Sequence, residues 1–241
     1  MACAIVEIVV SASASTRVKG SLSALWRFVR TAPLTYLWLT ALLITTLMQP
    51  QQWRGLLHAL QIHRSTNLRH LGADPLDVLF TSLFWIDGRS WTPYLVLFTL
   101  FLAPAEQWLG QMRWLTMGLT AHIGATYISE GALYIEIHNH LAPERMVNAR
   151  DIGVSYFLFG VTAVLAYHIT PPWRWVYLVV LVGVFAVALI INPGFTNIGH
   201  LAAIFIGLCF YPMVRRRHRP LWDPVQVWLR WRGSPKGRHT T

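Results

Sequence analysis

The feature that most constrains the fold is an uncharged segment, residues 152–169, which contains no Asp, Glu, Lys or Arg. It is long enough to span the hydrocarbon core of a bilayer, or nearly so, since a spanning helix needs about 20 apolar residues. Similar runs recur, and we expect five more spanning helices at about residues 32–48, 91–105, 114–133, 175–191 and 195–213. The sequence therefore predicts an all-α membrane protein with six transmembrane helices.

The composition and the distribution of charge agree with a membrane protein. Hydrophobic residues make up 54% of the chain and charged residues 12%, whereas soluble domains carry roughly a quarter charged residues. The net charge of +10 could suggest nucleic acid, but with six spans, 14 of the 20 Lys and Arg residues fall on the side that holds both tails. Because basic residues concentrate on the cytoplasmic side, we expect cytoplasmic termini, an integral protein of a bacterial plasma membrane and no nucleic-acid partner.

Three parts follow from this pattern. Residues 1–30 form a basic cytoplasmic tail, residues 31–213 form the membrane domain, and residues 214–241 form a second basic cytoplasmic tail. In the second tail, Asp223-Pro224 is typical of a helix start, and the Trp and Leu residues after it predict a short amphipathic helix on the membrane surface.

The long connection after the first span, residues 50–89, is too mixed in composition to cross the membrane. Residues 52–62 carry a narrow apolar stripe at helical spacing. Asp74 is typical of an N-cap and Pro75 of a first helical position, so residues 76–85 are predicted to form a helix in the outer interface.

A serine and a histidine lie at matching depths in two of the predicted spans. Ser155 lies about four residues into span four and His200 about six into span six, which corresponds to roughly 6 and 9 Å below the outer surface. An ionisable residue inside a span is costly and indicates a functional site, and a histidine can accept the proton of a serine nucleophile. The alternative is a serine that only packs between helices. Small residues allow the two spans to approach closely: Gly153, Gly160, Gly199, Ala202, Ala203 and Gly207.

With these residues in view, the sequence resembles the rhomboid family of intramembrane serine proteases over about residues 31–213. Residues 153–155, Gly-Val-Ser, match the first three positions of the family's Gly-x-Ser-Gly motif. His200, with Ala203 and Gly207 on the same helix face, matches the family's histidine followed by small residues. The resemblance implies a six-helix rhomboid-like bundle without a cofactor, in which a serine nucleophile and a histidine base form a dyad with no third acid.

Two further matches support the resemblance. Phe159, one turn below Ser155, stands where the family places an aromatic ring against the histidine. Glu106 and Gly110, with Arg113 following, mirror an acidic residue and a glycine that the family carries after its second span.

The sequence also departs from the family at the oxyanion-binding positions. Tyr156 replaces the second glycine of the serine motif, and Ser90 and Tyr94 align with the family's histidine and asparagine on span two. Losing one oxyanion donor typically costs about 3–4 kcal/mol of transition-state stabilisation. The hydroxyls of Ser90, Tyr94 and Tyr156, and the Ser155 backbone N–H, are the candidate donors.

The resemblance implies a protease that cleaves single-span membrane proteins near the outer face of the bilayer through Ser155 and His200. The alternative that the departures leave open is a catalytically inactive relative that binds membrane-protein clients. In both cases the partners are transmembrane helices and the lipid bilayer.

The other polar residues in the sequence give weaker indications of a function. Glu130, Glu136, His138 and His140 are competent metal ligands, but they lack helical His-x-x-x-His spacing, and we interpret them as solvated residues near the outer surface. His122, at mid-depth in span three, is expected to bond to a neighbouring helix. A transporter would show paired intramembrane charges or an inverted repeat, and neither is visible. No metal or cofactor is expected.

Overall fold

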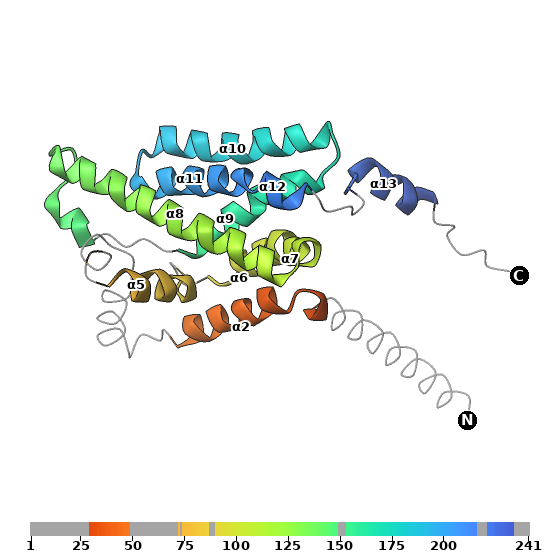
Figure 1. Cartoon of the computed structure of the whole chain (residues 1–241), viewed down its shortest axis with the longest axis horizontal. Helices are drawn as coiled ribbons and strands as arrows, with labels where there is room; N and C mark the ends of the chain where they lie inside the picture. The colour runs from red at the N-terminus through yellow and green to blue at the C-terminus, as the bar shows by residue number, and fades with distance from the viewer. Residues whose placement is uncertain are drawn as a thin grey trace, which may run out of the picture.

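The computed structural model describes residues 29–48, 72, 74–86, 90–148, 153–215 and 221–233, and within these residues it is helical without a β-strand (Figure 1). The elements are α2 (Pro33–Leu47), α5 (Pro75–Thr81), η2 (Ser82–Phe84), α6 (Thr92–Leu97), η3 (Phe98–Leu102), α7 (Ala103–Leu109), α8 (Gln111–His138), η4 (Glu144–Asn148), α9 (Val154–Val164), η5 (Leu165–His168), α10 (Trp173–Ile191), α11 (Phe195–Cys209), α12 (Tyr211–Val214) and α13 (Pro224–Gly233). The η3 segment is a π-helix, and the other η segments are 3-10 helices. The predicted all-α class is confirmed.

Helix α9 lies at the centre of the molecule and packs closely against α8 and α11. All its residues except Ser155 and Phe159 are buried, whereas α10 has no buried residue. Figure 1 shows α10 beside α11 on one side of the molecule and α2 and α5 on the other. The outer position of α10 suits its sequence, since an apolar helix that is not covered by protein needs another apolar environment.

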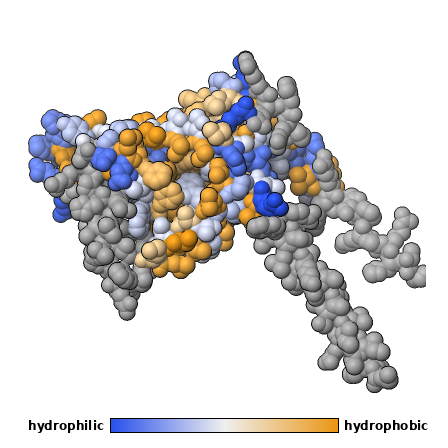
Figure 2. Space-filling view, turned by 60° about the horizontal axis from the view of Figure 1, so that its bottom comes forward, coloured by the Kyte–Doolittle hydropathy of each residue, from blue (hydrophilic) through white to orange (hydrophobic). Residues whose placement is uncertain are grey.

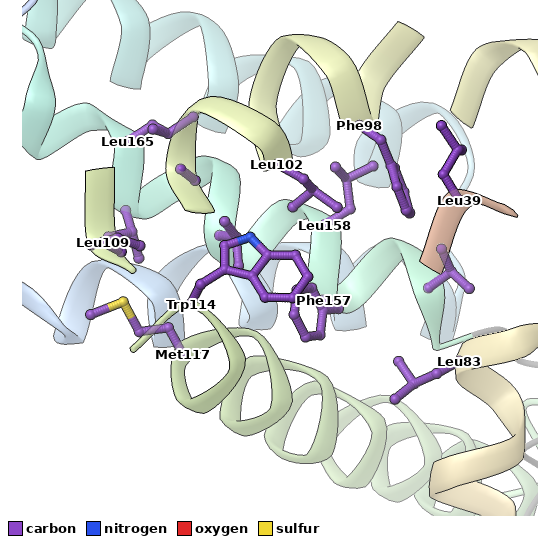
Figure 3. Packing of buried hydrophobic residues seen from close by; sticks show 14 of the residues in the cluster. Leu39, Leu83, Phe98, Leu102, Leu109, Trp114, Met117, Phe157, Leu158 and Leu165 are labelled. Atoms are coloured by element: carbon purple, nitrogen blue, oxygen red, sulfur yellow. The ribbon is translucent and has the colours of Figure 1, made fainter. Parts of the chain in front are cut away.

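The largest core cluster contains the rings of Phe157 and Trp114, which Figure 3 shows, and Trp38 packs against it. The ring of Phe157 on α9 lies 4.7 Å from that of Trp38 on α2 and 4.8 Å from that of Trp114 on α8, both edge to face. Gly118 makes room for this arrangement, because a Cβ there would overlap the Phe157 ring. Edge-to-face pairs add about 0.5–1.5 kcal/mol each beyond the area they bury. This cluster joins α2, α8 and α9.

On the other side of α9, small residues let three helices touch through their backbones. A Cβ on Gly207 of α11 would overlap the carbonyl oxygen of Gly160 on α9, and a Cβ on Gly160 would overlap the Cβ of Ala121 on α8. Such close approach is the usual basis of helix association in membranes, where lipid is as apolar as the helix surface. It fixes the distance between α9 and α11.

The start of α2 is capped by a residue far away in the sequence. The Glu106 carboxylate, on α7, accepts hydrogen bonds from the backbone N–H of Leu34 (3.0 Å) and Thr35 (2.8 Å) and from the Thr35 hydroxyl (2.7 Å). Four N–H groups at a helix start lack intrahelical partners and carry partial positive charge, which a carboxylate stabilises. The following turn needs Gly110, whose φ is 81°. Glu106 therefore ties α2 to the junction of α7 and α8.

One helix in the described part of the chain is both long and apolar enough to cross a membrane. It is α10, with 19 residues and a mean hydropathy of 2.5. Four shorter apolar segments accompany it: Pro33–Leu47, Pro75–Phe84, Val154–His168 and Phe195–Cys209.

Several local expectations are tested by these elements. Asp74 caps α5 through the Asp77 N–H, with Pro75 at its first turn, and α13 begins after Asp223 as predicted. The second predicted span, about residues 91–105, lies within a helical segment that continues to Leu109. Pro104 has no N–H to donate within this helix. The π-helical turn before it is wider than an α-helical turn, so the Ala103 N–H bonds to Phe98 O, five residues earlier. The predicted stripe at residues 52–62 lies outside the described residues.

Candidate active site

Ser155 is the second residue of α9, and Gly153 precedes that helix. Its side chain is half-buried, in contrast to its buried neighbours Val154 and Tyr156. The Phe157 N–H makes the first turn's hydrogen bond, to Gly153 O at 3.3 Å. The N–H groups before it belong to the end of the helix that carries partial positive charge. Ser155 is therefore held beside donors suited to a developing negative charge.

His200 is the sixth residue of α11, and its Nε2 lies 3.0 Å from Ser155 Oγ. This is hydrogen-bond distance for a serine hydroxyl donating to a neutral imidazole. The other ring nitrogen, Nδ1, is buried and has no hydrogen-bond partner in the described part of the structure. The structure thus brings together the serine and histidine that sequence depth had paired, and no described carboxylate orients the histidine.

Three aromatic rings surround the imidazole instead. Phe159 on α9 lies edge to face at 5.0 Å between ring centroids, Phe185 on α10 at 5.2 Å, and Tyr156 on α9 at 5.4 Å. Phe159 and Phe185 also contact each other at 4.4 Å. Phe159 lies where the family resemblance implied. Sequence reasoning missed Phe185, because nothing in the sequence of an apolar helix distinguishes a phenylalanine that faces a histidine on a neighbouring helix. The rings restrict the orientations of His200 in place of a hydrogen-bonded acid.

Tyr156 is fully buried, although it replaces a glycine of the family motif. The space for its ring comes from Gly199 on α11, where a Cβ would overlap the tyrosine hydroxyl. The hydroxyl therefore lies beside the residue that precedes His200. Tyr156 forms a small core cluster with Ala125 and Ala203.

The other two residues proposed as oxyanion donors lie around α6. Ser90 is exposed before the helix begins, and Tyr94 is half-buried with its ring 6.3 Å from Phe98, edge to face. Tyr94 packs against the large core cluster. Of the motif residues, Gly153 lies against the His122 ring and Gly207 lies at the Gly160 contact described above.

His122 contacts both the first connection and the start of α9. Its Nε2 lies 3.0 Å from Leu79 O at the end of α5 and 3.5 Å from Ser82 Oγ. A Cβ on Gly153 would overlap the His122 ring, so the imidazole fills the space that this glycine leaves open. The expected bond to a neighbouring helix is present, and its partner is the short helix α5, which η2 follows directly. His122 therefore holds α5 against the segment that carries Ser155.

The residues weighed as metal ligands do not come together in the described structure. The interpretation of Glu130 as a solvated residue is wrong, because its side chain is buried within α8. Glu136 is half-buried, and His138 and His140 are exposed. His138 stacks on Tyr134. Among the described residues, no group of three or more His, Cys, Asp or Glu side chains is placed to hold a metal ion.

Comparison with known proteins gives one match. The model of a family described as rhomboid-like protein matches residues 27–220, which is most of the chain. Searches of curated proteins and of solved structures give no match.

Proposed function

Because the chain belongs to the family of rhomboid-like proteins, we propose that it is an intramembrane serine protease that cleaves single-span membrane proteins near the outer membrane face. One observation supports this above the others, namely the 3.0 Å separation of His200 Nε2 and Ser155 Oγ across α9 and α11. A serine hydroxyl at its ordinary pKa is a poor nucleophile and needs an adjacent base.

The proposal includes six spans, formed by α2, the continuous segment from α6 to α7, α8, α9 with η5, α10, and α11 with α12. Residues 31–213 are the membrane domain, and the basic tails, residues 1–30 and 214–241, lie in the cytoplasm of a bacterial cell. With this orientation, Ser155 and His200 lie in the outer half of the bilayer. Among the described residues, the long apolar helix α10 and the four shorter apolar segments support this assignment.

In the first half of the reaction, His200 Nε2 takes the Ser155 proton while Oγ attacks the carbonyl carbon of the substrate peptide. The carbonyl oxygen becomes an oxyanion near the first turn of α9, whose N–H groups stabilise it. When the C–N bond breaks, the histidine returns its proton to the leaving amine, and an acyl-enzyme remains on Ser155. A water molecule, deprotonated by the same nitrogen, then releases the carboxylic acid and restores the serine.

A second candidate function is client binding without catalysis, and Tyr156 is the observation that favours it. Its buried ring stands at a position where the family motif has glycine, directly after the nucleophile. A protein with this ring in the site would keep the helix bundle and bind membrane helices without cleaving them.

The test uses the purified full-length chain, a fluorophosphonate probe and a single-span reporter in liposomes. We expect Ser155→Ala to abolish labelling and cleavage, and His200→Ala to lower both by about 10²–10⁴-fold, the usual contribution of a general base. Ser129→Ala, which alters another buried serine, is the matched control and should behave like the parent. A folded parent that does not react with the probe, together with client retention by both site variants, would establish the binding function instead.

A further inference from the structure

An apolar groove opens on the side of the molecule opposite α10. It is lined by residues of α2, α5, η2, α8 and α9, among them Phe84 of η2 and Phe157 of α9. Leu37 and Ala41 line it from α2, and Leu115 and Leu119 line it from α8. Figure 2 turns this side forward and shows hydrophobic side chains around a hollow. Neither Ser155 nor His200, which meet between α9 and α11, lines this groove.

The length and the lining of the groove indicate what it can hold. Its volume is about 290 Å³. It extends from Leu34 to Ala41, or about 10 Å along α2. Its lining is apolar throughout, which favours a hydrocarbon occupant. The groove therefore suits part of a single acyl chain.

Two arginines lie at the end of the groove where α2 and α8 begin. Arg30 is exposed and lies one turn before Leu34, and Arg113 is half-buried beside Trp114. The two helix starts lie together because Glu106, just before α8, caps α2. The Glu106 carboxylate is buried and engaged in that cap, so it does not face outward beside the two arginines.

We propose that this groove binds one anionic phospholipid of the cytoplasmic leaflet, with an acyl chain between α2 and α8 and the phosphate at Arg30 and Arg113. The apolar lining accounts for the chain, and the two guanidinium groups account for the phosphate, which arginine binds in bidentate geometry. In the proposed orientation these arginines face the cytoplasm, where anionic lipids attract basic residues. The inference rests on the proposed membrane embedding and is independent of protease activity.

The test measures phospholipid retained by the full-length chain after detergent purification from liposomes that hold equal amounts of phosphatidylglycerol and phosphatidylcholine with the same acyl chains. The parent should retain phosphatidylglycerol in preference. The double variant Arg30→Gln, Arg113→Gln should lose about 30-fold in that preference, since about 1 kcal/mol per basic residue gives about 2 kcal/mol for the two. Arg145→Gln, at an exposed arginine in η4, should leave it unchanged.

The acyl chain is tested by Ala41→Trp, which fills the groove and should reduce the retention of both lipids. Val180→Trp, on the exposed surface of α10, is its control. Equal retention by the two tryptophan variants would overturn the proposal. A change of oligomeric state with Ala41→Trp would show instead that a second copy occupies the groove. Because fluorophosphonate labelling of Ser155 is a separate readout, failure of the lipid site and failure of the protease proposal are distinguishable.

Discussion

The carboxylate of Glu106 should contribute several times more to stability than an average polar contact in a membrane protein. Its two oxygens accept three hydrogen bonds at the start of α2, and the side chain is 2% exposed. In Glu106→Gln, one oxygen becomes an NH₂ group that cannot accept. Either the Leu34 N–H, or the Thr35 N–H with the Thr35 hydroxyl, then loses its acceptor. An unsatisfied buried donor costs about 1–3 kcal/mol, and loss of the negative charge at a helix start costs up to about 2 kcal/mol. We expect a total loss of about 2–4 kcal/mol.

Equilibrium unfolding in mixed detergent micelles, followed by tryptophan fluorescence, measures this loss. Thr35→Val removes only the hydroxyl bond and should cost about 0.6 kcal/mol and at most about 1.7 kcal/mol, the average and the maximum that double-mutant cycles give for hydrogen bonds in a membrane protein. The double variant should be less destabilised than the sum of the two, because the interaction is counted twice in that sum. Labelling of Ser155 in the remaining folded protein should not change, since the cap lies at α2. A loss below about 0.5 kcal/mol for Glu106→Gln would refute the capping argument.

Two further predictions concern the contacts of α9. Tyr156→Phe keeps the ring on His200 and should leave fluorophosphonate labelling within a few-fold of the parent, because the hydroxyl lies beside Gly199; a loss of about 10²–10³-fold would instead identify the hydroxyl as an oxyanion donor. Gly207→Ala should destabilise the protein by about 1–3 kcal/mol through overlap with Gly160 O. Gly183→Ala on α10 meets no atom within 4 Å and should be neutral or stabilising by up to about 1 kcal/mol in the same unfolding assay.

The sequence carried enough information to predict the helices and the meeting of two side chains. Asp74-Pro75 and Asp223-Pro224 have the chemistry of helix starts, so α5 and α13 could be located without tertiary information. Ser155 and His200 could be paired because two spans with the same direction must place residues of equal depth at the same level. Depth does not determine which faces of the helices are turned toward each other. The small residues Gly160 and Gly207 determine which faces meet, because only those faces allow the two backbones to touch.

Contacts between distant segments could not be predicted, because they depend on the placement of one helix against another. Glu106 was identified by resemblance, but nothing in its neighbourhood shows that it accepts hydrogen bonds from residues 34 and 35. Likewise, His122 bonds to Leu79 O, and no periodicity within α8 indicates a partner in α5. The helical continuation through Pro104 depends on a π-helical turn, which has no clear sequence signal.

The exchange at Tyr156 shows how a departure from a motif can be accommodated by a second residue. A glycine after Ser155 would leave the space of this ring empty between α9 and α11. Here the tyrosine ring fills that space, and the missing side chain of Gly199 leaves room for it. The ring then contacts His200 from one side, as Phe159 and Phe185 do from others. A histidine without an acid partner needs its orientation fixed by packing, because a freely rotating imidazole would present Nε2 to the serine only part of the time. Tyr156 weakens the match to the motif, but its ring helps to hold His200 toward Ser155. It is compatible with the proposed catalytic dyad as long as backbone N–H groups of α9 stabilise the oxyanion.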